Sequence, residues 1–199
     1  MREQIKFCFK GHRNYVHGTD IFNAVCKNYQ NASGNVPTDI EMSIHHITRN
    51  NMTLVMQEEL LPAEKSAVNI IVKEKETIVK IALLENEEKV ECKYDYPEND
   101  IITAAKFNEV DKTITLINYH QYTLIEKLVA LNKSLLQALF TDAEGQWYFV
   151  KIKLANVDLN NQNPREIKLS FKKNMNFKLT QTEILVENKS VGNIYFSLV

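Results

Sequence analysis

The stretch Lys10–Cys26, KGHRNYVHGTDIFNAVC, decides the fold of this chain because it leads into an amphipathic helical run. Apolar side chains recur there at the spacing of one helical face, at Ile21, Phe22, Val25, Cys26 and Tyr29. This spacing predicts a helix over residues 21–29. Thr19 or Asp20 precedes the apolar run and carries a side-chain oxygen suited to capping the first turn.

Strands are predicted on both sides of this helix, because short β-branched and aromatic runs alternate with turn residues. In the first half they cover Ile5–Phe9, Asp39–Ile47, Met52–Glu58, Ala67–Lys73 and Thr77–Leu84. In the second half a strand, a longer helix and four strands are predicted at Thr113–Tyr119, Leu124–Phe140, Tyr148–Val157, Ile167–Phe171, Phe177–Glu187 and Val191–Val199. The order of elements in the second half thus repeats that in the first.

The two halves align as an internal repeat. Ile5 aligns with Ile114, and Asn23 aligns with Asn132 at the same offset. A duplication predicts three parts: an N-terminal repeat over 1–88, a crossover linker over 89–110 and a C-terminal repeat over 111–199.

Composition limits the classes of function. A net charge of −1 argues against nucleic-acid binding, and no apolar run is long enough to cross a bilayer. The N-terminus lacks the apolar core of a signal peptide. Three cysteines without CxxC spacing predict free thiols in a reducing cytoplasm, neither a disulfide framework nor a metal site. No phosphate-binding loop or metal cluster is present in the sequence, so we expect no cofactor.

The segment Val16–Ala24, VHGTDIFNA, resembles the helix-start motif of hotdog-fold thioesterases of the phenylacetate type, through His17, Gly18 and Phe22. With the repeat, the resemblance implies an α+β fold of tandem hotdog-like repeats, each a long helix wrapped by an antiparallel sheet. It also implies a homodimer of such double hotdogs. The sequence departs from the motif at Thr19, where the family has glycine, and at Cys26, where it has its catalytic carboxylate.

The resemblance implies a catalytic site at His17 and Gly18. The start of a helix offers unpaired backbone N–H groups that stabilise an oxyanion, and His17 is suited to act as a general base. The carboxylate partner is expected to be Asp20, or Glu126 from the second half. A purely structural interpretation also stands: His17-Gly18 as a tight turn, and Asp20 as a helix cap.

Substrate-binding roles are expected for Arg13, Tyr15, Thr19 and Asn23, with Arg13 and Tyr15 contacting an acyl group or a pantetheine phosphate. In the purely structural alternative, Arg13 is a solvated charge and Tyr15 is a packing residue.

Three hypotheses for function follow. The first is an enzyme on acyl-CoA or acyl-carrier-protein thioesters, either a thioesterase or a 3-hydroxyacyl dehydratase. The second is a non-catalytic hotdog-like protein that binds an acyl chain, a carrier protein or a partner subunit. The third is a different α+β duplication without this chemistry.

Overall fold

The computed structural model describes residues 2–57, 59, 61–62, 64–74 and 76–199. The end of the predicted strand Met52–Glu58 at Glu58 lies outside the described residues. The chain divides into two compact units, residues 1–97 and residues 98–199.

The first unit contains one long helix and seven strands among its described residues. They are β1 (Arg2–Ile5), β2 (Cys8–Lys10), α1 (Gly18–Ser33), β3 (Asp39–Ile44), β4 (Asn50–Gln57), β5 (Val68–Glu74), β6 (Thr77–Lys89) and β7 (Cys92–Tyr94). Five of the strands lie side by side and antiparallel in the order β1-β4-β6-β5-β3. The other two, β2 and β7, pair with each other in parallel.

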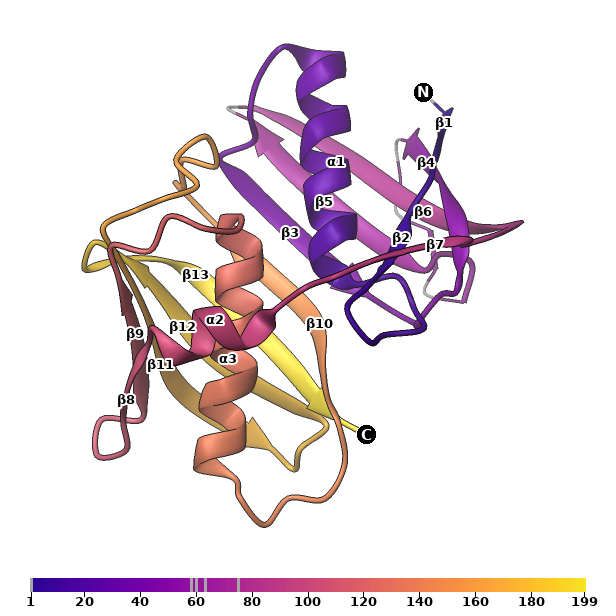
Figure 1. The fold of residues 1–199 in the computed structure, drawn as a ribbon. Helices are drawn as coiled ribbons and strands as arrows, with labels where there is room; N and C mark the ends of the chain where they lie inside the picture. The colour runs from indigo at the N-terminus through magenta and orange to yellow at the C-terminus, as the bar shows by residue number, and fades with distance from the viewer. Residues whose placement is uncertain (1, 58, 60, 63, 75) are drawn as a thin grey trace. The chain divides into compact units, whose positions relative to one another are not determined.

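Helix α1 lies against one face of the first unit's sheet (Figure 1). Its predicted apolar stripe is buried, since Ile21, Phe22 and Val25 are each at most 3% exposed. Burying side chains of this size is worth about 1.5–3 kcal/mol each. The hydroxyl of Tyr29 donates to Glu74 Oε2 of β5 at 2.7 Å, which ties the last turns to the sheet. The helix ends at Gly34, whose φ of 76° is one that glycine adopts readily.

The second unit contains two helices and six strands. They are α2 (Glu98–Thr103), β8 (Lys106–Asn108), β9 (Thr113–Ile117), α3 (Leu124–Leu139), β10 (Trp147–Leu154), β11 (Glu166–Met175), β12 (Leu179–Val186) and β13 (Lys189–Leu198). The strand order is β10-β13-β12-β11-β9-β8, and every pair is antiparallel.

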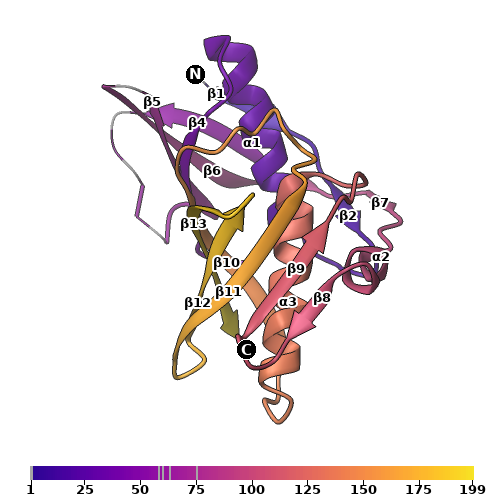
Figure 2. The same ribbon diagram turned by 90° about the vertical axis from the view of Figure 1, so that its left-hand side faces the viewer.

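Helix α3 lies along one side of the second unit's sheet (Figure 2). Its buried face includes Leu128, Leu131 and Leu135, each fully shielded from solvent. This is the leucine stripe of the predicted helix Leu124–Phe140, so that prediction is confirmed to within one residue. Helix α3 contacts four strands of the sheet and also the short helix α2.

The predicted fold class is wrong in its division into tandem repeats. Eleven of the described strands belong to one large antiparallel sheet, and the described helices are only three. The prediction expected tandem repeats, each a long helix wrapped by an antiparallel sheet. The physical reason is that any strand edge with unpaired backbone groups can accept another strand. The order of elements along a chain therefore does not fix where a sheet ends.

The prediction of three free cysteine thiols is also wrong. Cys8 and Cys92 form a disulfide across the β2–β7 pair, with their Cα atoms 4.7 Å apart, and Cys26 is free. The two cysteines lie 84 residues apart, so their spacing gave no signal. Among the described residues, no helix combines the length and the apolar character that a membrane crossing requires.

Candidate active site

The start of α1 places His17 at the N-cap, the last residue before the first helical turn. Its backbone is extended, with φ −77° and ψ 139°, and its carbonyl accepts from Asp20 N at 3.0 Å. His17 is 6% exposed. Its side chain makes no capping hydrogen bond. The prediction that Thr19 or Asp20 caps this helix is therefore wrong, because both residues lie inside the first turn.

The imidazole of His17 is held by the residue two positions along. His17 Nδ1 lies 2.7 Å from Thr19 Oγ1, and both side chains are buried. Thr19 Oγ1 in turn accepts from Lys10 Nζ at 3.0 Å. Thr19 was expected to bind substrate, and the structure instead places it between His17 and a buried ammonium group.

Lys10 is an important residue that the sequence interpretation missed. It is the last residue of β2, and its side chain is fully buried. Its Nζ also donates to Asp20 Oδ1 at 2.9 Å and lies 4.3 Å from the centroid of the Tyr96 ring. A buried cation needs such a carboxylate and aromatic face to offset its lost hydration.

Asp20 is accordingly the anionic partner of Lys10. The hydroxyl of Tyr94 donates to both carboxylate oxygens, at 2.9 and 2.8 Å. Two partners thus hold the carboxylate that we expected to serve catalysis. The contribution of Tyr94 had no sequence signal, because 74 residues separate it from Asp20.

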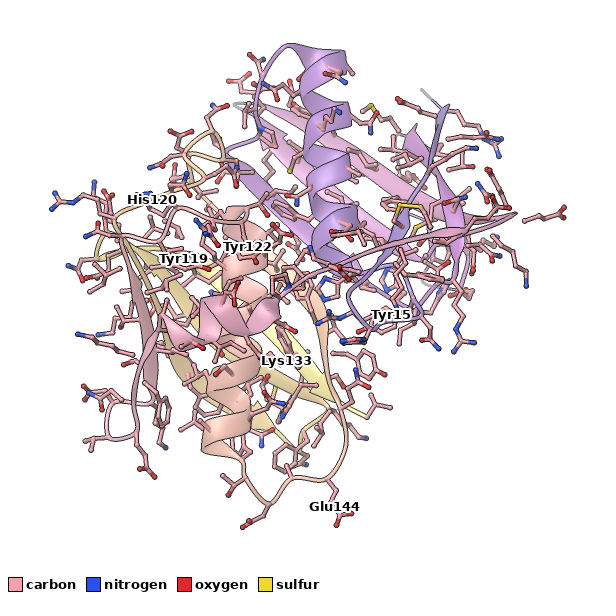
Figure 3. All side chains as sticks on the ribbon, in the orientation of Figure 1. Tyr15, Tyr119, His120, Tyr122, Lys133 and Glu144 are labelled. Atoms are coloured by element: carbon pink, nitrogen blue, oxygen red, sulfur yellow. A yellow bond between two sulfur atoms is a disulfide. The ribbon has the colours of Figure 1, made fainter. Side chains whose placement is uncertain are left out.

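The parallel pair β2–β7 brings these side chains together. Cys8 pairs with Cys92, and two residues further on Lys10 pairs with Tyr94. Side chains two residues apart point to the same face of a strand. The disulfide therefore fixes the register that presents Lys10 and Tyr94 to the start of α1. Figure 3 shows this disulfide as the yellow bond beside β2 and β7.

The three other predicted binding residues of this unit lie around the same helix start. The ring of Tyr15, labelled in Figure 3, has its centroid 6.4 Å from that of His17. The guanidinium of Arg13 lies 5.9 Å from the Tyr96 ring centroid. Asn23 is half-buried in the second turn of α1. The structure thus brings Arg13 and Tyr15 to the surroundings of Lys10 and His17.

Cys26 stands where the family motif has a carboxylate. It is half-buried on α1, and burial raises the pKa of its thiol to about 12. Burial therefore favours the neutral thiol of Cys26 over the thiolate, which is the nucleophilic form.

Glu126 belongs to the second unit, where it caps α3. Its Oε2 accepts from Thr123 N at 2.7 Å and from Thr123 Oγ1 at 2.8 Å, which completes a capping box. The next residue, Lys127, is fully shielded from solvent, and burial lowers its pKa. Its Nζ donates to the carbonyls of Tyr119 and Gln162, at 3.2 and 2.5 Å, and to Asn163 Oδ1 at 3.0 Å.

A hollow of about 290 Å³ also occurs in the second unit, away from any residue predicted to act. It lies at one end of strands β9, β11 and β12, and its lining residues are Ile117, Asn118, Arg165, Glu166, Glu187 and Asn188. Within the described residues, no group of three or more His, Cys, Asp or Glu side chains is placed to hold a metal ion.

No family model matches the sequence, and no curated protein matches it significantly. Solved structures do match. The tesB protein of Mycobacterium avium subspecies paratuberculosis aligns with a TM-score of 0.55 and 9% identity, over 100% of this chain and 92% of that one. The dehydratase domain of PpsC from Mycobacterium tuberculosis, in complex with C12:1-CoA, aligns with a TM-score of 0.54 and 9% identity, over 100% of this chain and 92% of that one. A Thermobifida fusca protein assigned as a thioesterase II aligns with a TM-score of 0.54 and 7% identity, over 100% of this chain and 93% of that one.

This likeness shows the fold: the chain has the hotdog fold of these thioesterases and dehydratase domains. The resemblance inferred from Val16–Ala24 is confirmed at that level. The tandem arrangement that was inferred together with this resemblance is not confirmed. At 7–9% identity the likeness does not extend to activity or to site residues.

Proposed function

We propose that this protein acts on acyl thioesters, as a thioesterase or a 3-hydroxyacyl dehydratase. The observation that carries the proposal is the position of His17 at the N-terminus of α1, directly before Gly18. A helix start offers backbone N–H groups and a partial positive charge, both suited to a developing oxyanion. The kinship of the fold with thioesterases and dehydratase domains supports the same class of chemistry.

In this proposal Gly18 allows the thioester carbonyl to approach the backbone closely, since glycine has no side chain. His17 supplies the acid–base or hydrogen-bonding group. Arg13, Tyr15 and Asn23 bind the remainder of the substrate. The carrier is coenzyme A or an acyl carrier protein, whose pantetheine phosphate Arg13 is suited to contact.

Both carboxylates that were predicted to act with His17 contact other groups in the structure. Asp20 is engaged by Lys10 and Tyr94, and Glu126 caps its own helix. Both assignments remain predictions. We propose that His17 and Gly18 form the essential pair, with Asp20 acting through Lys10.

A turnover assay with a panel of acyl-CoA and acyl-carrier-protein thioesters tests the proposal. We expect hydrolysis or dehydration of at least one substrate. His17→Ala should lower kcat/KM by at least about 10²-fold, the usual loss on removing a positioned acid–base group or an oxyanion donor. His120→Ala is the matched control and should leave the rate unchanged. If no substrate on the panel turns over, the enzymatic proposal is wrong.

A second candidate function is non-catalytic binding of an acyl chain, a carrier protein or a partner subunit. It is favoured by the buried thiol of Cys26, which cannot supply the family's carboxylate. This candidate predicts a measurable Kd for acyl-CoA or loaded carrier protein without turnover, and a Kd that Asp20→Asn leaves unchanged. Turnover that disappears in His17→Ala would contradict it.

The expected homodimer and the expected cytoplasmic location both remain predictions. The Cys8–Cys92 disulfide weighs against a cytoplasmic location, because glutathione and thioredoxin keep most cytosolic thiols reduced.

A further inference from the structure

The hydroxyl of Thr19 lies between three polar side chains whose hydrogen-bonding capacities differ. Lys10 Nζ is 3.0 Å away, His17 Nδ1 is 2.7 Å away and Asp20 Oδ1 is 3.4 Å away. A threonine hydroxyl has one proton to donate and two lone pairs that accept. The position of that proton bears on the protonation of His17 Nδ1, because a hydroxyl that donates to Nδ1 needs that nitrogen unprotonated.

Lys10 donates a hydrogen bond to one lone pair of Thr19 Oγ1. An ammonium group donates and never accepts, so the 3.0 Å contact has only one direction. Lys10 is fully buried, and its Nζ also donates to Asp20 Oδ1 at 2.9 Å. A hydroxyl that accepts from a cation is polarised and becomes a stronger donor.

The proton of Thr19 then has two acceptors within reach. Asp20 Oδ1 at 3.4 Å is too distant for a good O–H···O hydrogen bond, whose usual length is about 2.5–3.0 Å. That oxygen also already accepts from Lys10 and Tyr94. His17 Nδ1 at 2.7 Å has the length expected when a hydroxyl donates, and it is shorter than most N–H···O contacts.

We infer that Lys10 and Thr19 are positioning residues that hold neutral His17 with its proton on Nε2, so that His17 serves as a hydrogen-bond donor, not as a general base. The proton assignment is argued from the contacts of the Thr19 hydroxyl with Lys10, His17 and Asp20. What His17 donates to rests on the proposed function: the carbonyl oxygen of a thioester, which becomes negatively charged in the transition state. No proton is transferred in this role.

Nitrogen-15 NMR of protein labelled in its histidine rings tests the proton assignment without any turnover. A ring nitrogen that carries a proton differs clearly in chemical shift from one that does not. The spectrum of His17→Gln identifies the His17 signals among the five histidines. In the neutral ring of wild-type His17, we expect an unprotonated Nδ1 and a protonated Nε2. A proton on Nδ1 would overturn the inference.

Two substitutions at Thr19 separate a positioning role from a structural one. Thr19→Val keeps the shape but removes the hydroxyl, so we expect His17 to become a mixture of both tautomers. Thr19→Ser restores the donor and should restore the wild-type shifts. Lys10→Met removes the cation and should shift the population toward the Nδ1–H form. Unchanged His17 shifts in folded Thr19→Val, with folding checked by amide spectra, would also overturn the inference.

Where turnover is detected, two substitutions of His17 distinguish a donor from a base. Glutamine keeps an N–H donor but is not basic, whereas alanine keeps neither. We expect His17→Ala to lose about 10²–10³-fold in kcat, the cost of removing an oxyanion donor, and His17→Gln to recover about 10-fold of it. Equal losses would show that His17 acts as a base. Absence of turnover would contradict the proposed function and leave the NMR result as the deciding test of the tautomer.

Discussion

The ammonium group of Lys10 shows how one side chain organises the start of α1. It is fully buried, and its contacts include Asp20, Thr19 and the face of the Tyr96 ring. The side chain of Asp20 is 16% exposed, so water screens the ion pair only weakly. Breaking a buried pair costs more than the pair itself contributes, because the remaining charge stays buried without its partner.

We expect Asp20→Asn to lower the free energy of unfolding by about 3 kcal/mol, since it leaves the buried Lys10 cation uncompensated. The double variant Lys10→Met/Asp20→Asn should regain most of this loss because it removes both charges. Urea unfolding of the four proteins of this double-mutant cycle measures the coupling. Asp142→Asn, at an exposed position, is the control. Additive effects of the two substitutions would contradict a direct ion pair.

At the scale of the element, the start of α3 depends on a second buried lysine. Lys127 Nζ donates to two loop carbonyls and to Asn163, and so joins the loop before α3 to the loop before β11. The loop before α3 also contains Tyr122, a non-glycine residue with φ 66°. In Figure 3, Tyr119, His120 and Tyr122 lie together next to the start of α3. The rings of Tyr119 and Tyr122 stack with centroids 6.4 Å apart.

Lys127→Met should destabilise the protein by about 2 kcal/mol at neutral pH, since it leaves three acceptors without their donor. Lys133→Met on the same helix is the control. Its side chain is 26% exposed and its salt bridge to Glu98 is long, at 3.6 Å, so we expect a loss below about 1 kcal/mol. Chemical denaturation at pH 7 measures both.

The same pair of variants tests a pH dependence. Burial lowers the pKa of Lys127 below the ordinary value of 10.5, so above the lowered pKa the unfolded chain binds the proton more strongly than the native protein. Stability from this group therefore rises as pH increases through the lowered pKa toward 10.5, and it is lost as pH falls. The stability difference between wild type and Lys127→Met should widen over that window. A constant difference would contradict the lowered pKa.

The elements were easier to predict than their ends. The leucines of α3 recur strictly at helical spacing, and the capping box at Thr123 and Glu126 begins the helix at the predicted residue. Helix α1 begins at Gly18, three residues before its apolar stripe. Its N-cap is His17, which has no place among preferred capping residues. A cap that works through backbone geometry alone leaves no composition signal.

For the whole molecule, the hotdog fold was predicted from the sequence, but its division into tandem repeats was wrong. His17 and Gly18 were proposed as site residues because they lie next to one another in a recognisable motif, and that assignment stays a prediction. Lys10 and Tyr94 were missed as a pair because their contact depends on the parallel pairing of β2 and β7. Parallel strands are joined by a long connection, so no turn motif in the sequence indicates that they pair. The disulfide was missed for the same reason.

That disulfide gives a prediction for the stability of the whole chain. It closes a loop of 84 residues in sequence separation, and in the chain-entropy account such a cross-link contributes about 4–5 kcal/mol. Cys8→Ser/Cys92→Ser, or reduction of the wild type, should lower Tm substantially. Loss of the β2–β7 register should also release Tyr94 from Asp20. Cys26→Ser is the matched control, because Cys26 forms no disulfide. Calorimetry with and without reductant measures the difference, and mass spectrometry of the unreduced protein counts the free thiols.

One free thiol and a Tm that falls on reduction would support the cross-link. Three free thiols in protein purified without reductant would contradict it.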